Sequence, residues 1–250
     1  MSRLKNKVAV ITGGNSGIGF GIAQEFKNEG AKGVIIGRNQ ETLDRSAAKL
    51  GNNFIAINAD VTNVADLERA FKETSKKFGK IDVIVANAGG GTVGTVATID
   101  EAEYDKTMNL NLKSVYFTVQ KGLPYMNDGG SIILIGSNAA HRAYANFTLY
   151  GASKAAVIYF AKGFSSDLLD RKIRVNVITP GTTDTPAFEK FVPADRIEAV
   201  KTHFASVMPT GRIGQPSDIG KTAVFLASDD SSFMLGAELL VDGGMTYLAK

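Results

Sequence analysis

The stretch VAVITGGNSGIG, residues 8–19, decides the fold of this 250-residue chain. Its first five residues are apolar or β-branched and lack polar alternation, which is typical of a strand buried on both faces of a parallel sheet. After the glycines, Ile22, Ala23 and Phe26 lie on one side of a helical pattern that ends at Gly30. A glycine-rich loop between a strand and a helix predicts a phosphate-binding loop.

The glycine loop has a physical reason to bind an anion. Glycine lets the backbone turn sharply and approach a ligand without a Cβ atom in the way. The first amide groups of the helix then point at the ligand, and the helix dipole favours negative charge there, as in a pyrophosphate. The alternative is a tight turn that only joins the strand to the helix. The residues expected to contact a dinucleotide here are Gly13, Asn15, Ser16, Ile18 and Gly19.

Strand-like apolar runs alternate with helical patterns along the chain. This alternation predicts a three-layer α/β/α fold, a Rossmann-type doubly wound parallel sheet of about seven strands, as a single domain over residues 1–250. The expected strands span residues 8–12, 33–36, 54–60, 81–86, 131–135, 173–179 and 238–241. Later helical patterns are expected over residues 64–78, 101–126 with an interruption at Pro124, from near Tyr150, in part of 188–208, and over 219–227.

The composition argues against several classes of site and partner. The chain has no cysteine, hence no disulfide and no thiolate metal site, and its two histidines, His141 and His203, show no metal-ligand spacing. The net charge is +3 with scattered basic residues, which argues against nucleic acid as a partner. No apolar run approaches the length of a membrane helix, and the N-terminus lacks a signal-peptide pattern. We therefore expect no metal, no nucleic-acid or membrane partner, and a cytoplasmic protein.

Arg38 follows the second expected strand, where parallel sheets bind ligands beyond their carboxyl ends. An Asp or Glu at this place would bind the ribose hydroxyls of NAD(H). The arginine instead favours a 2′-phosphate, and hence NADP(H) over NAD(H). Its alternative role is that of a surface cation that faces solvent.

The third expected strand ends at Asp60, which Val61 follows. The carboxylate of Asp60 is placed to accept a hydrogen bond from the adenine amino group. Alternatively, it caps the next helix, a role for which Thr62 and Asn63 are rivals.

Small residues follow the fourth expected strand, and they let a flat cofactor lie close to the backbone. The asparagine among them has an alternative role as a turn residue that holds two strand ends together. These residues are Asn87, Ala88 and Gly89.

Tyr150 is the only one of the seven tyrosines with a lysine, Lys154, four residues later. On a helix this spacing places both side chains on one face, one turn apart. A phenol beside an ammonium group is a candidate acid/base pair. The alternative is a coincidence on a helix surface.

The motifs occur in an order that resembles the short-chain dehydrogenase/reductase family, in its short single-domain branch. The likeness covers nearly the whole chain, and one departure is Ser114, where relatives often carry glycine. The residues that carry it are TGGNSGIG at 12–19, then Asp60, Asn87-Ala88-Gly89, Ser137, Tyr150, Lys154 and Pro180-Gly181.

The resemblance implies a mechanism. The cofactor would deliver hydride to a carbonyl carbon, Tyr150 would donate a proton to the carbonyl oxygen, and Ser137 would hydrogen-bond the same oxygen. Lys154 would hold the nicotinamide ribose and lower the pKa of Tyr150, by up to about 3 units for a charge roughly 4 Å away. Asn111, preferred over Asn109, would hold a water that passes protons to solvent.

The resemblance also extends the list of binding residues. Thr183 and Thr185 would hold the carboxamide, and His141 and Arg142 are expected to be solvated, with substrate contact as the alternative. The further cofactor contacts are Asn87, Ala88, Gly89, Tyr150, Lys154, Pro180 and Gly181, and the expected substrate contacts are Ser137, Asn138, Tyr144, Tyr150 and Phe188.

Reduction of a ketone or aldehyde is the function that these motifs favour, with a small-molecule carbonyl or alcohol as partner. A 3-oxoacyl-thioester reductase and a catalytically silent NAD(P)-binding regulatory protein remain alternatives. An enoyl reductase is disfavoured because such relatives place the tyrosine and lysine farther apart, and a methyltransferase would not require the pair. The resemblance further implies a homotetramer formed through the helices that carry Asn111 and Tyr150.

Overall fold

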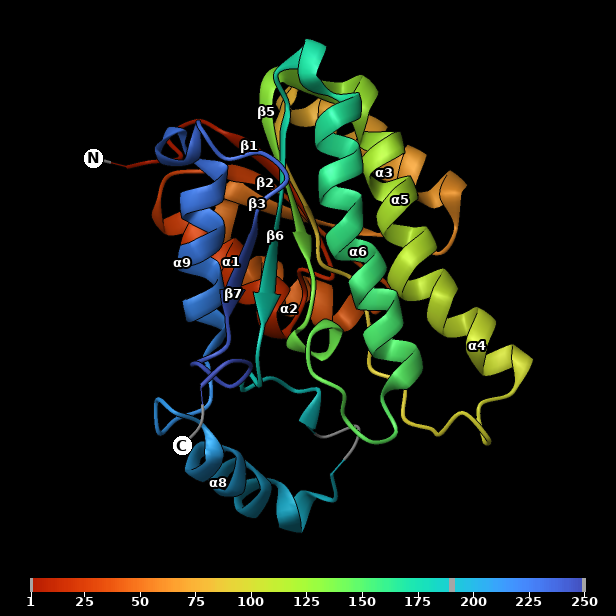
Figure 1. Ribbon diagram of the computed structural model, residues 1–250. Helices are drawn as coiled ribbons and strands as arrows, with labels where there is room; N and C mark the ends of the chain where they lie inside the picture. Colours follow the sequence, from red (N-terminus) through yellow and green to blue (C-terminus); the bar gives the residue numbers. More distant parts are fainter. Residues whose placement is uncertain (1, 189–191, 249–250) are drawn as a thin grey trace.

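The computed structural model describes residues 2–188 and 192–248, and within them a seven-stranded parallel sheet lies between two helical layers (Figure 1). The strand order is β3-β2-β1-β4-β5-β6-β7, so the order reverses between β1 and β4. The strands are β1 Val8–Thr12, β2 Lys32–Gly37, β3 Phe54–Asn58, β4 Ile81–Ala86, β5 Met126–Ile135, β6 Arg174–Pro180 and β7 Glu238–Val241.

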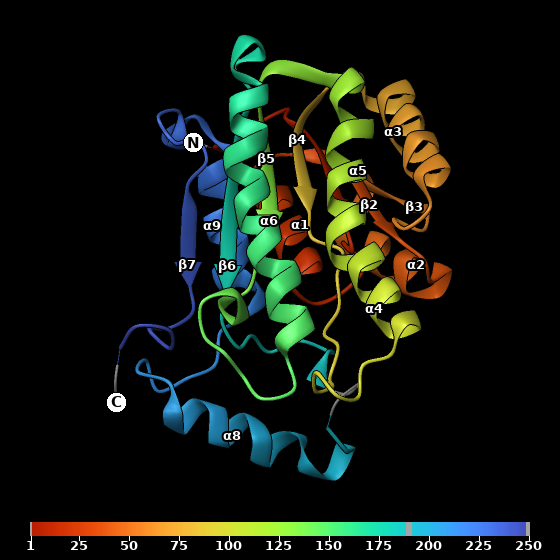
Figure 2. The same ribbon diagram turned by 45° about the vertical axis from the view of Figure 1, so that its right-hand side comes forward.

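Helices cover both faces of the sheet (Figures 1 and 2). The helices α1, α2 and α9 pack on one face, and α3, α5 and α6 pack on the other. Helix α8 lies beyond the carboxyl ends of the strands (Figure 2). The bounds are α1 Gly17–Asn28, α2 Gln40–Leu50, α3 Val64–Phe78, α4 Glu101–Met108, α5 Ser114–Gly122, α6 Thr148–Asp167, α8 Ile197–Val207 and α9 Pro216–Ala227.

Strand β1 shows why the sheet is covered on both sides. All five of its residues are buried. Val8 and Val10 pack into the core beneath α3 and α5, whereas Ala9 and Ile11 pack into the core beneath α1 and α9. Successive side chains point to opposite faces of a strand, so an apolar run without alternation needs cover on both faces. The predicted fold class is therefore confirmed.

Several predicted boundaries were wrong by a few residues. The strand expected at 131–135 begins at Met126, and the strand expected to reach Asp60 ends at Asn58. By contrast, the helical segment expected over 101–126 with an interruption at Pro124 is confirmed as far as Tyr125: α5 ends at Gly122, and a 3-10 turn that contains Pro124 follows over Leu123–Tyr125. Helix α2 was not predicted from the sequence. Residues 189–191 of the expected partly helical stretch lie outside the described residues.

The long helical segment is irregular around Asn111. A π-helical turn, Asn109–Lys113, separates α4 from α5. Single π turns of this kind are frequent at functional sites. The irregularity brings the buried Asn111 side chain toward the end of β4, as the next section describes.

None of the helices within residues 2–188 and 192–248 is both long and apolar enough to cross a membrane. In the same part of the chain, no three histidine, aspartate or glutamate side chains form a group that could hold a metal ion.

Candidate functional site

The glycine loop is packed so closely that its glycines cannot be replaced. A Cβ atom on Gly19 would lie 2.2 Å from the carbonyl oxygen of Gly13, and Gly13 itself has a φ of +64°. Helix α1 begins at Gly17 and its first helical hydrogen bond is donated by the Phe20 amide, to Ser16 O. The amides of Gly17, Ile18 and Gly19, in the first turn, therefore have no partner one helical turn back, and they are available to an anion.

Helix α2 holds the glycine loop from outside. The Asn15 side chain donates to Thr42 Oγ1 at 2.7 Å, and Ser46 Oγ donates to the Asn15 carbonyl at 2.9 Å. Ser16 precedes the helix with an exposed side chain that makes no capping bond, while Ile18 packs partly on the core. The loop is thus pre-shaped by the protein, which lowers the ordering cost of binding a ligand.

Asn87 holds the ends of β1 and β4 together. Its side-chain Nδ2 donates to the carbonyl oxygens of Thr12 and Gly13, at 2.9 and 3.3 Å. The backbone amides of Asn87 and Ala88 both donate to Thr12 Oγ1. The alternative role of a residue that joins two strand ends is therefore the one observed. Contact of Asn87 and Ala88 with a cofactor stays a prediction.

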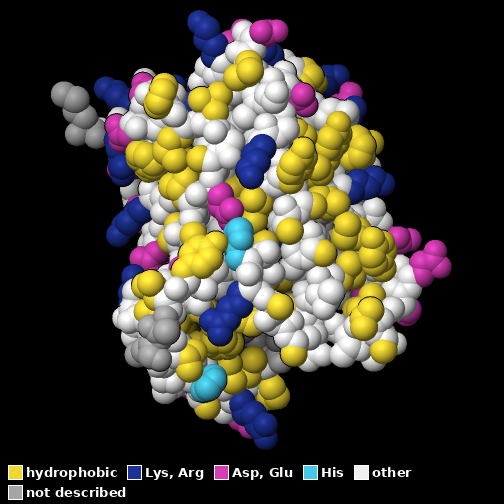
Figure 3. Space-filling view, viewed as in Figure 1, with side chains coloured by type: hydrophobic (Ala, Val, Ile, Leu, Met, Phe, Trp, Pro, Cys, Tyr) yellow, Lys and Arg dark blue, Asp and Glu magenta, His cyan; other side chains and the backbone are white. Residues whose placement is uncertain are grey.

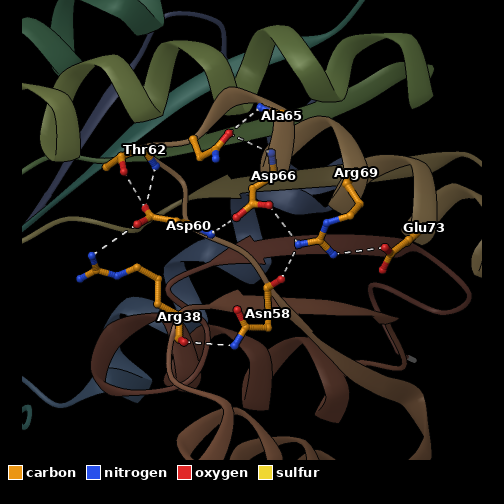
Figure 4. A network of polar contacts seen from close by, with 9 residues as sticks. Arg38, Asn58, Asp60, Thr62, Ala65, Asp66, Arg69 and Glu73 are labelled. Atoms are coloured by element: carbon orange, nitrogen blue, oxygen red, sulfur yellow. Dashed lines mark hydrogen bonds and ion pairs between the residues drawn. The ribbon is translucent and has the colours of Figure 1, made fainter.

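Arg38 and Asp60 form an ion pair that their sequence positions did not reveal (Figure 4). Arg38 Nη1 lies 3.6 Å from Asp60 Oδ2, and the two side chains are 67% and 35% exposed. The pair places a cation and an anion at the ends of neighbouring strands β2 and β3. Val61, the next residue, is buried in the core.

Other residues hold Asp60 in place (Figure 4). Thr62 donates to Asp60 Oδ1 through its amide and its hydroxyl, at 2.9 and 2.8 Å, and the Asp60 amide donates to Asp66 Oδ2. Burial raises the pKa of Asp60, but the bonds from Thr62 and the charge of Arg38 outweigh it, so that the pKa is lowered. Asn63, not Asp60, caps α3. The capping alternative for Asp60 is therefore wrong.

Lys154, Asn111 and Gly89 converge at the end of β4. Lys154 is only 4% exposed and its Nζ donates to the Ile135 carbonyl at 2.9 Å. A Cβ atom on Gly89 would lie 3.3 Å from Lys154 Nζ and 3.1 Å from Asn111 Oδ1. Gly89 therefore leaves a small space in front of a buried ammonium group.

Tyr150 lies near Lys154 and makes a hydrogen bond with Ser137. Ser137 follows β5, and its hydroxyl accepts a hydrogen bond from the Ala139 amide at 3.2 Å. Burial raises the pKa of Tyr150, and a hydrogen bond with the Ser137 side chain opposes the rise. Lys154 Nζ lies 5.9 Å from the centre of the Tyr150 ring. The predicted pair is thus brought together with the predicted serine.

The predicted pKa of Tyr150 was wrong in direction. We expected the charge of Lys154 to lower it, yet the phenol titrates above its ordinary value because burial disfavours the phenolate. Burial also lowers the pKa of Lys154 to about 8. A lysine that is partly neutral near that pH stabilises a phenolate less than a permanent charge would.

Asn111 binds the backbone of the β4–α4 loop. Its Oδ1 accepts from the Gly90 amide and its Nδ2 donates to the Gly90 carbonyl, both at 2.9 Å. Nδ2 also approaches Ser153 Oγ at 3.3 Å, and that hydroxyl donates to the Tyr150 carbonyl at 2.7 Å. Sequence reasoning missed Gly90 and Ser153 as partners, although Ser153 lies inside the Tyr150–Lys154 motif. The predicted water at Asn111 stays a prediction.

The loop after β6 crosses toward the glycine loop. Pro180 ends β6, and a Cβ atom on Gly181 would lie 2.7 Å from Asp242 Cα. Thr183 donates to the Gly181 carbonyl at 3.0 Å, and a Cβ atom on Gly17 would lie 3.2 Å from Thr185 Cβ. The predicted cofactor residues from both halves of the chain therefore share one edge of the sheet.

The loop before α6 is tied to the C-terminal segment. His141 Nε2 and Glu238 Oε1 lie 2.6 Å apart, and Arg142 Nη1 donates to the Met245 carbonyl at 2.8 Å. Both residues are exposed, as expected, and each also has a partner near the C-terminus. The Asn138 side chain donates to the Tyr144 hydroxyl at 3.0 Å.

Phe188 lies on the other side of the strand ends, where its ring meets that of Phe204 in α8 with centres 6.2 Å apart. The aromatic pair joins the segment after β6 to α8. The expected contact of Phe188 with a substrate stays a prediction.

Comparison with known proteins points in one direction. The family model described as "Enoyl-(Acyl carrier protein) reductase" matches residues 13–246. The chain is 40% identical to "Oxidoreductase asL5" of Sarocladium schorii, over 99% of each chain. It is 36% identical to "Hydroxynaphthalene reductase-like protein Arp2" of Metarhizium brunneum, over 96% of this chain and 95% of that one.

Solved structures agree with these sequence relatives. A short-chain dehydrogenase/reductase from Serratia marcescens superposes with a TM-score of 0.90 at 31% identity, over 98% of this chain and 99% of that one. A protein from Brucella melitensis titled short-chain dehydrogenase/reductase and glucose/ribitol dehydrogenase superposes with a TM-score of 0.91 at 32% identity, over 99% of each chain.

Proposed function

The chain belongs to the short-chain dehydrogenase/reductase family, and from that premise we propose that it is an NADP(H)-dependent reductase of ketones or aldehydes, with Tyr150 as its general acid. Members of the family are oxidoreductases that use a nicotinamide cofactor. The observation that carries the proposal is the convergence of Ser137, Tyr150 and Lys154 behind the space that Gly89 leaves open.

The protein's own residues fit a dinucleotide. The glycine loop presents helix amides without helical partners, and Gly13 and Gly19 leave no room for side chains. Gly89 keeps the surface in front of Lys154 free of a Cβ atom. When bound, the nicotinamide group would supply the hydride. Lys154 would hold the nicotinamide ribose, and Asn15 and Ser16 would hold the cofactor at the glycine loop, at the other end of the site.

Tyr150 would then provide the proton. Because burial keeps its pKa above the ordinary value, the phenol is protonated at neutral pH and acts as a donor to the carbonyl oxygen. Ser137 would hydrogen-bond the same oxygen and hold it within reach. Lys154, whose pKa of about 8 lies near neutrality, would return a proton to Tyr150 after the reaction. The hydrogen bonds from Asn111 to Ser153 and from Ser153 to the Tyr150 carbonyl would hold the helix turn of Asn111 against the helix turn of Tyr150.

The choice of NADP(H) rests on Arg38. Its guanidinium is 67% exposed, and it lies within 3.6 Å of Asp60, whose carboxylate would accept from the adenine amino group. A 2′-phosphate beside Arg38 would complete its hydrogen bonding, because a guanidinium binds phosphate oxygens in a bidentate manner. The carboxylate of Asp60 would keep the guanidinium at the ribose end of the site.

Carbonyl reduction is favoured over reduction of a carbon–carbon double bond. The matching family model carries the description "Enoyl-(Acyl carrier protein) reductase". The relative from Metarhizium brunneum is instead named as a hydroxynaphthalene reductase-like protein. Tyr150 and Lys154 are four residues apart, on one face of α6. That spacing is the one the family resemblance associates with carbonyl substrates. An oxoacyl thioester remains a second substrate class.

A second copy of the chain is the partner that we propose for the face formed by α5 and α6. Hydrophobic side chains gather over this side of the molecule (Figure 3). Tyr116 is 42% exposed and Tyr159 is 70% exposed, and the Tyr116 ring packs against Phe160 and Phe164. Exposed aromatic patches of this kind mark interfaces. A homotetramer with this face buried would show the expected mass in light scattering.

A turnover screen with a matched variant tests the function. Purified protein is mixed with NADPH or NADH and a panel of ketones, aldehydes and enones, and cofactor oxidation is followed at 340 nm. We expect ketone reduction with NADPH, and a loss of at least about 1,000-fold in kcat for Tyr150→Phe, with the cofactor affinity retained. Full turnover by Tyr150→Phe, or reduction of enones alone, would contradict the proposed chemistry.

A further inference from the structure

Tyr144 is held at two points in the loop between β5 and α6. Its hydroxyl oxygen accepts a hydrogen bond from Asn138 Nδ2 at 3.0 Å. The guanidinium carbon of Arg142 lies 5.7 Å from the centre of its ring. Arg142 is itself fixed, since its Nη1 donates to the Met245 carbonyl at 2.8 Å. An aromatic side chain that is restrained at its tip and on its face is pre-organised for contact.

The hydrogen-bonding capacity of this pair is only half used. The Tyr144 oxygen accepts from Asn138, and among residues 2–188 and 192–248 the tyrosine's own proton has no acceptor. Within the same residues, Asn138 Oδ1 has no donor, although the Asn138 side chain is only 6% exposed. Burial raises the pKa of Tyr144, against the opposing effects of Arg142 and Asn138. The phenol is therefore a neutral donor beside an acceptor.

The pair lies on the chain segment between two residues of the proposed carbonyl site. Asn138 directly follows Ser137, and Tyr144 lies on the loop that connects Ser137 to Tyr150. A donor and an acceptor side by side match a hydroxyl group, which can accept from one and donate to the other. Such a pair discriminates between ligands, because a ligand without the hydroxyl forgoes both hydrogen bonds.

We propose that Asn138 and Tyr144 bind a hydroxyl group of the substrate, so that the substrate class is a hydroxyketone whose hydroxyl lies near the reacting carbonyl. This inference rests on the proposed function, since it takes Ser137 and Tyr150 to hold the carbonyl oxygen. In it, Tyr144 donates to the substrate hydroxyl, and Asn138 Oδ1 accepts from it. Arg142 acts through Tyr144 as a positioning residue.

Substrate pairs that differ by one hydroxyl test the inference. The pairs are 2-butanone with 4-hydroxy-2-butanone, and cyclohexanone with 3-hydroxycyclohexanone. We expect the unchanged protein to prefer the hydroxylated member by at least about 10-fold in kcat/KM, the effect of one good hydrogen bond. Tyr144→Phe removes only the hydroxyl, and it should lower kcat/KM more for the hydroxylated member than for the plain ketone, so that the preference is lost. The matched control is Tyr104→Phe, on an exposed tyrosine of α4, which should keep the preference.

The possible outcomes are distinct. An equal loss for both members of a pair would overturn the inference, because it would mean that Tyr144 only supports the fold of the loop. An unchanged preference in Tyr144→Phe would overturn it as well, since the tyrosine then faces only solvent. The inference would also be overturned if the unchanged protein showed no preference for the hydroxylated ketones. If no ketone of either pair is reduced, or Tyr150→Phe retains full turnover, the proposed function fails and the inference fails with it.

Discussion

Replacement of Arg38 by alanine should change the choice of cofactor. Arg38 carries an exposed guanidinium at the end of β2, 3.6 Å from the Asp60 carboxylate. If this guanidinium binds a 2′-phosphate, its loss weakens NADPH, which carries that phosphate, and spares NADH, which lacks it. We expect kcat/KM for NADPH to fall while kcat/KM for NADH stays within about twofold.

The size of the loss follows from the setting of the side chain. A hydrogen bond to a charged group contributes about 1.5–3 kcal/mol, and the 67% exposure of Arg38 places it toward the lower end. That corresponds to a loss of about 10- to 30-fold for NADPH. The fold itself should be little affected, because an exposed ion pair such as that with Asp60 contributes at most about 1 kcal/mol. Thr62 still holds the Asp60 carboxylate after the change.

The assay compares kcat/KM and the dissociation constants of the two cofactors at low and high salt. Arg45→Ala is the matched control, since it removes an equally exposed arginine from the neighbouring helix α2, where Arg45 pairs with Glu41. Arg45→Ala should leave the ratio of NADPH to NADH unchanged. Equal losses for both cofactors in Arg38→Ala, or a preference of the unchanged protein for NADH, would refute the reasoning.

Two other substitutions test the site. Gly19→Ala should abolish cofactor binding in fluorescence titrations, because its Cβ atom would lie 2.2 Å from the Gly13 carbonyl oxygen. The control is Gly163→Ala, in open space on α6, which should preserve binding and add about 0.5–1 kcal/mol of stability. Tight cofactor binding by Gly19→Ala would contradict the packing of the glycine loop. Lys154→Met should stabilise the protein against heat below pH 8. Burial lowers the pKa of Lys154 to about 8, so below that pH the folded state must hold a buried ammonium group, at a cost of up to about 3 kcal/mol in the free energy of unfolding. Methionine removes this cost. The cost disappears as the pH rises from 8 toward the ordinary pKa of 10.5, so the stability gained by Lys154→Met should shrink over that range. A gain in stability that does not depend on pH would show that burial does not lower the pKa of Lys154.

Local pattern was enough to predict the fold and the order of the site residues. The run Val8–Thr12 is buried on both faces as its lack of alternation required, and the glycines after it are as confined as a phosphate loop demands. The boundaries were less predictable. The start of β5 at Met126 depends on pairing with β4, where the register shifts between Ile81 and Val83, and a shift of this kind leaves no mark in one strand's sequence.

The ion pair and the helix irregularity show what one-dimensional reasoning could not reach. Arg38 and Asp60 are far apart in sequence and meet only because β2 and β3 are neighbours in the sheet. Asn111 stands out in the sequence as a candidate site residue, but its partners Gly90 and Ser153 come from two other elements. Partners across elements are set by packing, so their identities require the folded chain.

Sequence alone determined which residue types stand at the carboxyl ends of the strands, because strand, loop and helix signals are local. The family resemblance, the Tyr150–Lys154 spacing and the glycine loop all belong to that level. The tertiary structure alone decided the protonation of the site. Burial is a property of everything packed around a group, so it took the assembled fold to raise the pKa of Tyr150 and to lower that of Lys154 to about 8.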